Sequence, residues 1–200
     1  MKTVLTIFAA CMLLSGIAFA QDSPIDKGSF QLGGGISFFN YGGDYYENSD
    51  GDALTMFEFD PAFHYFFIDG LAVGARLSFA NATQGDYKVS EFGFGPEARY
   101  YFSVGQRTET KGSIFPYLGA GFTYESLTSN NGFPGAEDDK FTATEIAFFG
   151  GATYMLSSAV GLFGQLEYDM HSFKQKEPVE SDSVDGTVFG FFTGFTFFLP

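Results

Sequence analysis

Residues 57–79 read FEFDPAFHYFFIDGLAVGARLSF, and this stretch decides the fold. On both sides of the pair Asp69-Gly70, apolar residues recur at every second position, while polar or small residues such as Glu58, His64 and Arg76 occupy the positions between them. Alternation with a period of two is typical of β-strands, and Asp-Gly is a signal for a tight turn. The stretch therefore predicts two antiparallel strands joined by a hairpin turn.

The same alternation recurs along most of the remaining chain. Each alternating run is roughly 10 to 14 residues long, which is the length that a tilted membrane-spanning strand requires. No run of 18 apolar residues follows the N-terminal segment, so the sequence predicts no membrane-spanning helix there. Eight such runs are present, at about residues 29–38, 57–65, 71–79, 91–102, 114–125, 145–154, 160–169 and 188–199.

The direction of the apolar face separates a membrane barrel from a soluble one. The interior of an eight-stranded barrel is just wide enough to be filled by side chains, whereas the apolar face carries about twenty Phe and Tyr rings, so these rings must point outward. The opposite face carries Arg76 and Arg99, each of which would cost about 2–4 kcal/mol at lipid depth. The sequence thus predicts an all-β fold, an eight-stranded antiparallel transmembrane β-barrel with an up-and-down meander and a polar lumen.

The first twenty residues have the pattern of a cleaved signal peptide. Lys2 precedes an apolar stretch over residues 4–17, and Ala18-Phe19-Ala20 has the small-x-small form that precedes a cleavage site. The apolar stretch is shorter than the roughly 20 residues that a spanning helix needs. We therefore expect residues 1–20 to be removed and residues 21–200 to form the barrel. The single cysteine, at position 11, would be lost, which excludes disulfides and thiol chemistry.

The charge of the chain excludes one large class of partners. Ten Lys and Arg residues stand against 24 Asp and Glu residues, giving a formal net charge of -14. A chain without a basic surface has nothing to hold the phosphates of a nucleic acid. We expect no nucleic-acid partner.

The connections between the runs predict the orientation of the barrel. Polar and mostly long connections are expected at residues 42–52, 81–86, 126–140 and 171–185, and tight turns at 69–70 and 157–158, although the segment 103–112 is longer than this scheme requires. Outer-membrane barrels place short turns in the periplasm and long loops outside. The long connections are acidic, with four carboxylates in 42–52, but no spacing matches a dedicated metal site.

Three prolines interrupt the alternating runs. Proline has no N–H to donate to a strand ladder, so it belongs at bulges or strand ends. We expect Pro61, Pro96 and Pro116 to lie at the periplasmic rim.

Several segments of the sequence resemble a known family. Residues 61–74 (PAFHYFFIDGLAVG), 95–102 (GPEARYYF) and 116–121 (PYLGAG) are similar to the strand-turn-strand phrases of the outer-membrane β-barrel domain family, the small OmpA/OmpX-like, porin-family barrels of Gram-negative bacteria. The resemblance covers residues 28–199. It implies a location in the outer membrane, contact with membrane lipid and lipopolysaccharide, and insertion by the barrel assembly machinery. The family's last strand ends on an aromatic residue, and the terminal Pro200 departs from that pattern.

The polar face holds the candidate site, a network of ionisable side chains inside the lumen. Centring the hairpin turn near residues 83–84 predicts that Arg76 lies opposite Glu91, and the following hairpin places Glu91 opposite Glu125. Similar arithmetic places Glu145 near Glu167 and Asp169. The predicted network comprises Glu58, Asp60, His64, Arg76, Glu91, Glu97, Arg99, Glu125, Glu145 and Glu167.

Three functions are compatible with such a lumen. A network that fills the barrel indicates a structural or surface-interaction role through the acidic loops. A narrow channel for cations or small solutes would use the same carboxylates. A lipid-modifying enzyme would need a Ser-His-acid arrangement, but His171 and Ser172 are adjacent and point to opposite faces, so we expect His171 to be a histidine at the base of a loop.

We adopt the first of these functions. His64 has no second His or Cys nearby in the sequence, so we predict no metal site, and we expect no catalytic residues and no cofactor. The expected protein is a monomeric outer-membrane barrel that is not an enzyme.

Overall fold

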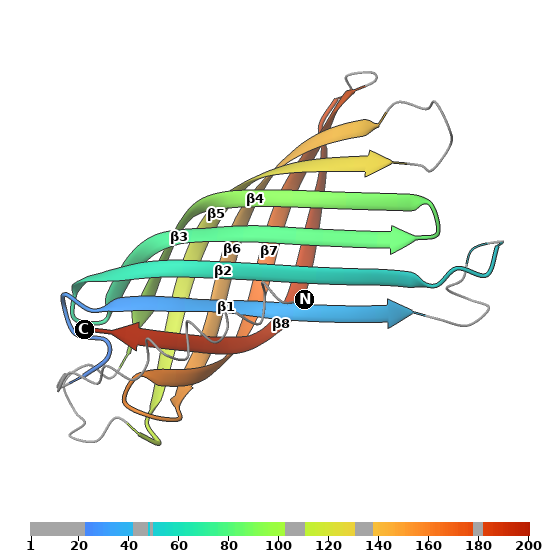
Figure 1. Cartoon of the computed structure of the whole chain (residues 1–200). Coiled ribbons are helices and arrows are strands. Elements are labelled where there is room, and N and C mark those ends of the chain that lie inside the picture. Colours follow the sequence, from blue (N-terminus) through green and yellow to red (C-terminus); the bar gives the residue numbers. More distant parts are fainter. Residues whose placement is uncertain (1–22, 42–47, 49, 103–110, 131–137, 178–181) are drawn as a thin grey trace.

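The chain folds into a closed antiparallel barrel of eight strands in meander order (Figure 1). The computed structural model describes residues 23–41, 48, 50–102, 111–130, 138–177 and 182–200, so the predicted signal peptide lies outside the described residues. The predicted fold class is confirmed. The strands are β1 Phe30–Tyr41, β2 Leu54–Ile68, β3 Leu71–Gln84, β4 Tyr87–Tyr101, β5 Ile114–Asn130, β6 Asp139–Met155, β7 Val160–Glu177 and β8 Val184–Leu199.

The two ends of the barrel differ in their connections. The turn at Asp69-Gly70, the segment 156–159 and the C-terminal Pro200 lie at one end, which we call the turn end. The turn Gly85-Asp86 and the C-terminal ends of β1, β5 and β7 lie at the other, the loop end. Among the described residues no helix is long and apolar enough to cross a membrane.

Two of the predicted long connections are mostly strand. β3 continues to Gln84, and the turn to β4 consists of Gly85 and Asp86, with Gly85 at a φ of +59°. Similarly, β7 continues to Glu177, so residues 171–177 are not loop. Apolar residues alternate only where one face of a strand contacts lipid. The strand itself continues past the lipid, and there polar residues can occupy both of its faces. The pattern of apolar residues therefore predicted the C-terminal ends of β3 and β7 too early in the sequence. The predicted connection 103–112 lies mostly outside the described residues.

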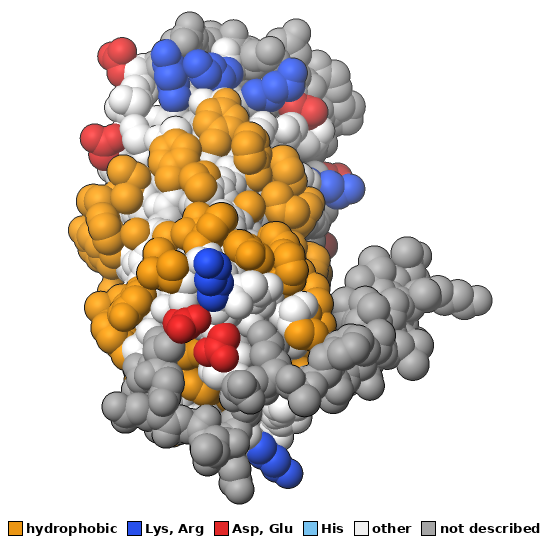
Figure 2. All heavy atoms as spheres, turned by 90° about the vertical axis from the view of Figure 1, so that its left-hand side faces the viewer, with side chains coloured by type: hydrophobic (Ala, Val, Ile, Leu, Met, Phe, Trp, Pro, Cys, Tyr) orange, Lys and Arg blue, Asp and Glu red, His pale blue; other side chains and the backbone are white. Residues whose placement is uncertain are grey.

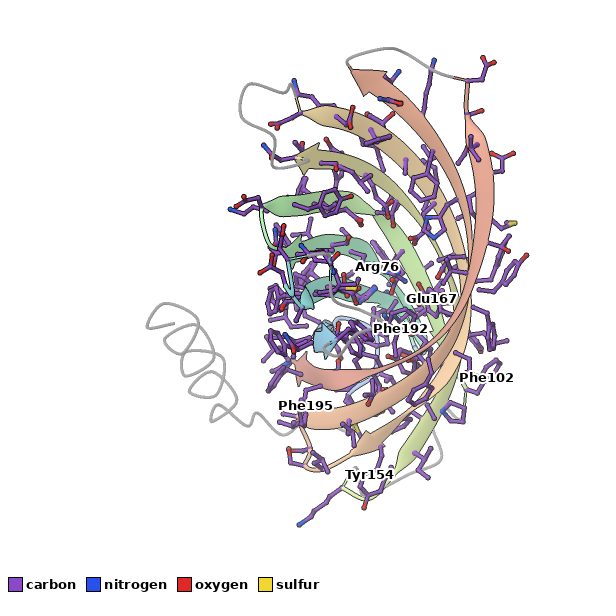
Figure 3. All side chains as sticks on the ribbon, turned by 90° about the vertical axis from the view of Figure 1, so that its right-hand side faces the viewer. Arg76, Phe102, Tyr154, Glu167, Phe192 and Phe195 are labelled. Carbon is purple, nitrogen blue, oxygen red and sulfur yellow. The ribbon has the colours of Figure 1, made fainter. Side chains whose placement is uncertain are left out.

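The apolar face of the barrel points outward, as predicted. Figure 2 shows hydrophobic side chains over much of one side of the barrel, and large apolar side chains of all eight strands are exposed. Along most of β5 exposed and less exposed residues alternate, so that Leu118 is 57% exposed whereas Tyr117 is 1% exposed. Figure 3 shows Phe102 and Tyr154 on the outside of the wall and Arg76 inside it.

Two prolines lie inside strands rather than at the rim. Pro61 lies in the middle of β2 and Pro96 lies well inside β4, so the rim prediction is wrong for both, while Pro116 is close to the start of β5. At Pro61 the ladder to β3 skips two residues, and at Pro96 the ladder to β5 does the same. A residue without an N–H fits where the ladder is already interrupted.

The seam between the first and last strands is the shortest ladder of the barrel. β1 and β8 pair only over Phe30–Gly34 and Phe195–Leu199, close to the turn end. Toward the loop end β8 bends away from β1 (Figure 1). The barrel is therefore held together most extensively at the turn end.

The outward apolar face yields a test that uses two positions on one face of β5. Leu118→Arg places a charge in the middle of the apolar face and is expected to lower the free energy of unfolding by about 2–4 kcal/mol, because arginine is costly near the bilayer midplane. Thr128→Arg, on the same face near the loop end, is the control and is expected to cost about 1 kcal/mol or less. Denaturant titration of the protein refolded in lipid vesicles measures the free energy of unfolding of both variants. Equal losses would contradict the inference that position 118 lies deeper in the bilayer than position 128.

Candidate functional site

The side chains inside the barrel form three layers along its axis. At the turn end lies an apolar layer, which we call the aromatic floor; its buried members are Ile25, Phe66, Tyr101, Phe115, Tyr117, Phe149, Met155 and Phe198. Above it lies an ion-paired layer, made by His64, Arg76, Glu97, Arg99, Gln165 and Glu167. Toward the loop end lies an acidic cup, lined by Glu58, Asp60, Glu91, Glu125, Glu145, Asp169 and His171.

The rings of the aromatic floor pack against one another across the lumen near the turn end. Phe66 and Tyr101 are completely buried, with ring centroids 5.8 Å apart, and Tyr101 lies 5.1 Å from Tyr117. The Nε2 of Gln31 donates to the hydroxyls of Tyr101 (2.8 Å) and Thr196 (2.9 Å), which links β1, β4 and β8 within the packed layer. Protein interiors packed in this way leave few voids larger than a water molecule.

One carboxylate organises the ion-paired layer. Glu97, on β4, is 2% exposed and accepts hydrogen bonds from His64 Nε2 (2.9 Å), Arg76 Nε (2.8 Å) and Arg99 Nε. These partners come from β2, β3 and β4, whose polar faces all point inward. A buried charge is tolerated when it is paired and hydrogen-bonded, and Glu97 meets both conditions.

The two arginines also connect the wall strands across the lumen. Arg76 Nη1 donates to Glu167 on β7 (2.6 Å), and Figure 3 shows these two side chains in the interior. The guanidinium of Arg99 lies over the ring of Phe149, 5.2 Å from its centroid. Gly119, on the neighbouring strand, makes room for that ring, because a Cβ there would collide with it. Arginines stacked in this way fill the lumen as well as neutralise it.

The acidic cup is a half-open cavity of about 250 Å³ above these two layers. Glu125, Glu145 and Asp169 are all more than nine-tenths buried in its wall. Positive charge reaches the cup from Arg76, whose Nη1 lies 3.6 Å from Glu145, and from His171 when it is protonated. The negative charge of the lumen is thus concentrated toward the loop end.

The sequence placed the candidate residues on the correct face but misplaced two of their neighbours. Arg76 pairs with Gly95 and not with Glu91, because the turn is centred on Gly85-Asp86 and not on 83–84. Glu91 instead accepts a hydrogen bond from Ser78 (3.3 Å). The predicted pairing of Arg76 with Glu91 is therefore wrong.

The predicted pairing of Glu91 with Glu125 is also wrong. The predicted cluster of Glu145, Glu167 and Asp169 agrees with the structure. Glu125 lies opposite Gly93, one inward position away from Glu91. Glu145, Glu167 and Asp169 do lie together, with one carboxylate oxygen from each within 4.8 Å of the others.

Some residues of the site were missed or assigned a different place. His171 is not at the base of a loop: it lies within β7, opposite Glu145 on β6, and lines the cup. The filling roles of Gln31 and Gln165 were also missed, although both stand at inward positions of alternating runs. Tyr117 Oη donates to Gln165 Oε1 (2.9 Å), and Gln165 in turn donates to Glu167.

The chain is similar to known outer-membrane proteins. The family model described as outer membrane protein beta-barrel domain matches residues 6–197, and no curated protein matches the chain. Among solved structures, the N-terminal β-barrel domain of Pseudomonas aeruginosa OprF is 16% identical, with 86% of this chain and 98% of that chain covered and a TM-score of 0.49. OprG from Pseudomonas aeruginosa is 15% identical (89% and 99% covered, TM-score 0.48), and Neisserial surface protein A is 14% identical (86% and 94% covered, TM-score 0.47).

The ion-paired layer yields a stability test. Glu97→Gln leaves Arg76, Arg99 and His64 without their shared carboxylate, and is expected to lower the free energy of unfolding by about 3–5 kcal/mol. Glu58→Gln is the control, since Glu58 accepts a hydrogen bond from a serine that glutamine can also accept, and its expected cost is about 1 kcal/mol or less. Denaturant titration compares them, and a Glu97→Gln variant as stable as the control would contradict the assigned role.

Proposed function

Because the chain belongs to the outer membrane protein beta-barrel domain family and is an outer-membrane protein of the Gram-negative type, we propose that it is a non-conducting barrel with a structural or surface-interaction role. In this proposal the protein is a monomer, is inserted by the barrel assembly machinery, and contacts membrane lipid and lipopolysaccharide. It has no enzymatic activity and acts through its loop end.

The aromatic floor is the observation that carries this proposal. A solute that crossed the barrel would have to pass Phe66, Tyr101 and Phe198, which are at most 3% exposed and in ring contact with one another. Immediately above them, Glu97 binds the guanidinium groups of Arg76 and Arg99 and the imidazole of His64, which come from three strands. Both layers would have to rearrange before a continuous path could open, which supports a lumen closed at the turn end.

The loop end supports a surface role through its charge. The backbone N–H groups of Asp50 and Asp52 both donate to Asn48 Oδ1, which fixes these two acidic residues on a compact turn. Asp138, beyond β5, accepts a hydrogen bond from Asn130 (2.8 Å). Ordered carboxylates at the outer surface would attract cationic groups, including divalent ions bound to lipopolysaccharide phosphates.

The rival function is a narrow cation channel, and the acidic cup favours it. Its carboxylates would concentrate cations at the loop end, but the floor would have to open for cations to pass.

Conductance in planar bilayers separates the two functions. The purified barrel is expected to give no stable conductance steps, because the floor is closed. Tyr101→Ala serves as the comparison, since removing this ring thins the floor and is expected to raise leakage. Reproducible cation-selective steps from the unaltered protein, abolished by Glu91→Gln and Glu125→Gln, would establish the channel instead.

The enzymatic alternative has its own test. In β7 the side chains of His171 and Ser172 lie on opposite faces of the strand, which does not suit a nucleophile and its base. Mass spectrometry of lipid A from cells with and without the protein is expected to show identical acyl chains. Loss or gain of an acyl chain that depends on the protein would refute the non-enzymatic role.

A further inference from the structure

The acidic cup holds more buried negative charge than its cationic neighbours neutralise. Glu125, Glu145 and Asp169 are 4%, 8% and 5% exposed. Arg76 is the nearest arginine, but its Nε is committed to Glu97 and its Nη1 lies closer to Glu167 than to Glu145. Buried carboxylates are stable only when they are paired, protonated or bound to a metal ion.

The spacing of three of these carboxylates suits a common ligand. Glu145, Glu167 and Asp169 each present one oxygen, and these oxygens lie within 4.8 Å of one another. A Ca²⁺ ion binds oxygens at about 2.3–2.6 Å, so two of its ligands lie at most about 5 Å apart. The three oxygens therefore lie close enough together for one ion to bridge them.

An independent observation points to the same place. Asp169 is more than nine-tenths buried and lines the cavity, yet its Oδ1 atom has no hydrogen-bond partner in the protein. Buried polar atoms are almost always satisfied, so an unsatisfied carboxylate oxygen at a cavity wall marks a position where a ligand completes the structure.

A small residue lies opposite Asp169 on the neighbouring strand. Its cross-strand partner on β6 is Ala147, which is fully buried and has the smallest side chain that still holds an inward position. Glu145 and Phe149 flank Ala147 on the same face, and they pair with His171 and Glu167 on β7. Three carboxylates, those of Glu145, Glu167 and Asp169, therefore lie around Ala147 on the inner face of the two strands.

We propose that Glu145, Glu167 and Asp169 form a binding site for a divalent, oxygen-preferring cation such as Ca²⁺ or Mn²⁺ inside the barrel. Glu125 and His171 adjoin this site through Glu145, since their ligand atoms and that of Glu145 also lie within 4.8 Å of one another. The ion would neutralise the carboxylates and bridge β6 to β7 at the level where the ion-paired layer ends. This site goes beyond the proposed function and does not depend on whether the lumen conducts.

Calorimetric titration tests the site on the complete barrel in detergent micelles. The protein is treated with EDTA, dialysed, and titrated with Ca²⁺ and with Mn²⁺ at pH 7, and bound Mn²⁺ is also followed by electron paramagnetic resonance. One saturable site per barrel is expected. If the carboxylates are instead neutralised by protons alone, no saturable binding will be seen, and the proposal fails.

Variants separate a defined site from general attraction by negative charge. Asp169→Asn and Glu145→Gln each remove one ligand charge and are expected to weaken binding by about tenfold or more. Glu91→Gln removes the same charge from the same cavity, outside the ligand set, and is expected to weaken binding by no more than about threefold.

The comparison of cation affinities still tests the site if one of the two ligand variants folds poorly. Folding is checked by the difference in gel mobility between boiled and unboiled samples, and either ligand variant suffices beside the control. Equal weakening by all three substitutions would show diffuse screening and overturn the site.

Discussion

The structure depends on one constraint: within hydrocarbon every backbone N–H and C=O must find its partner inside the protein. Eight strands satisfy this by pairing in order around a closed barrel. Closure with so few strands leaves a lumen that is only as wide as its own side chains. The outward face must then be apolar, and each ionisable group must either lie in the lumen or stand beyond the bilayer. The alternation of faces and the filled interior both follow from this requirement.

A different kind of side chain fills the lumen at each level along the barrel axis. Near the turn end, rings such as Tyr101 and Phe66 pack against one another. In the middle, Glu97 satisfies Arg76 and Arg99, whose guanidinium groups stack on Phe149. Toward the loop end carboxylates predominate and a cavity remains. From the turn end to the loop end the lumen therefore changes from apolar to neutralised to acidic.

The sequence predicted the fold and the face of each candidate residue, because period two and the inability of rings to fit inside are properties of single strands. Arg76, Glu97 and Glu167 could thus be assigned to the lumen without a structure. Their partners could not, since the register depends on where each turn is centred: a shift to Gly85-Asp86 moved Arg76 away from Glu91. The place of His171 was also hidden, because β7 continues past the last apolar residue that faces lipid.

If the lumen is open only toward the loop end, a reagent should reach it from that side of the membrane alone. A chain whose only cysteine replaces Ser78, a residue lining the cup, would be reconstituted into vesicles with its orientation determined by proteolysis. A membrane-impermeant thiol reagent would then be supplied to one side at a time. If the aromatic floor blocks the other side, reaction is expected from the loop side alone. Comparable reaction from the turn side would contradict it, because the reagent would have crossed the aromatic floor.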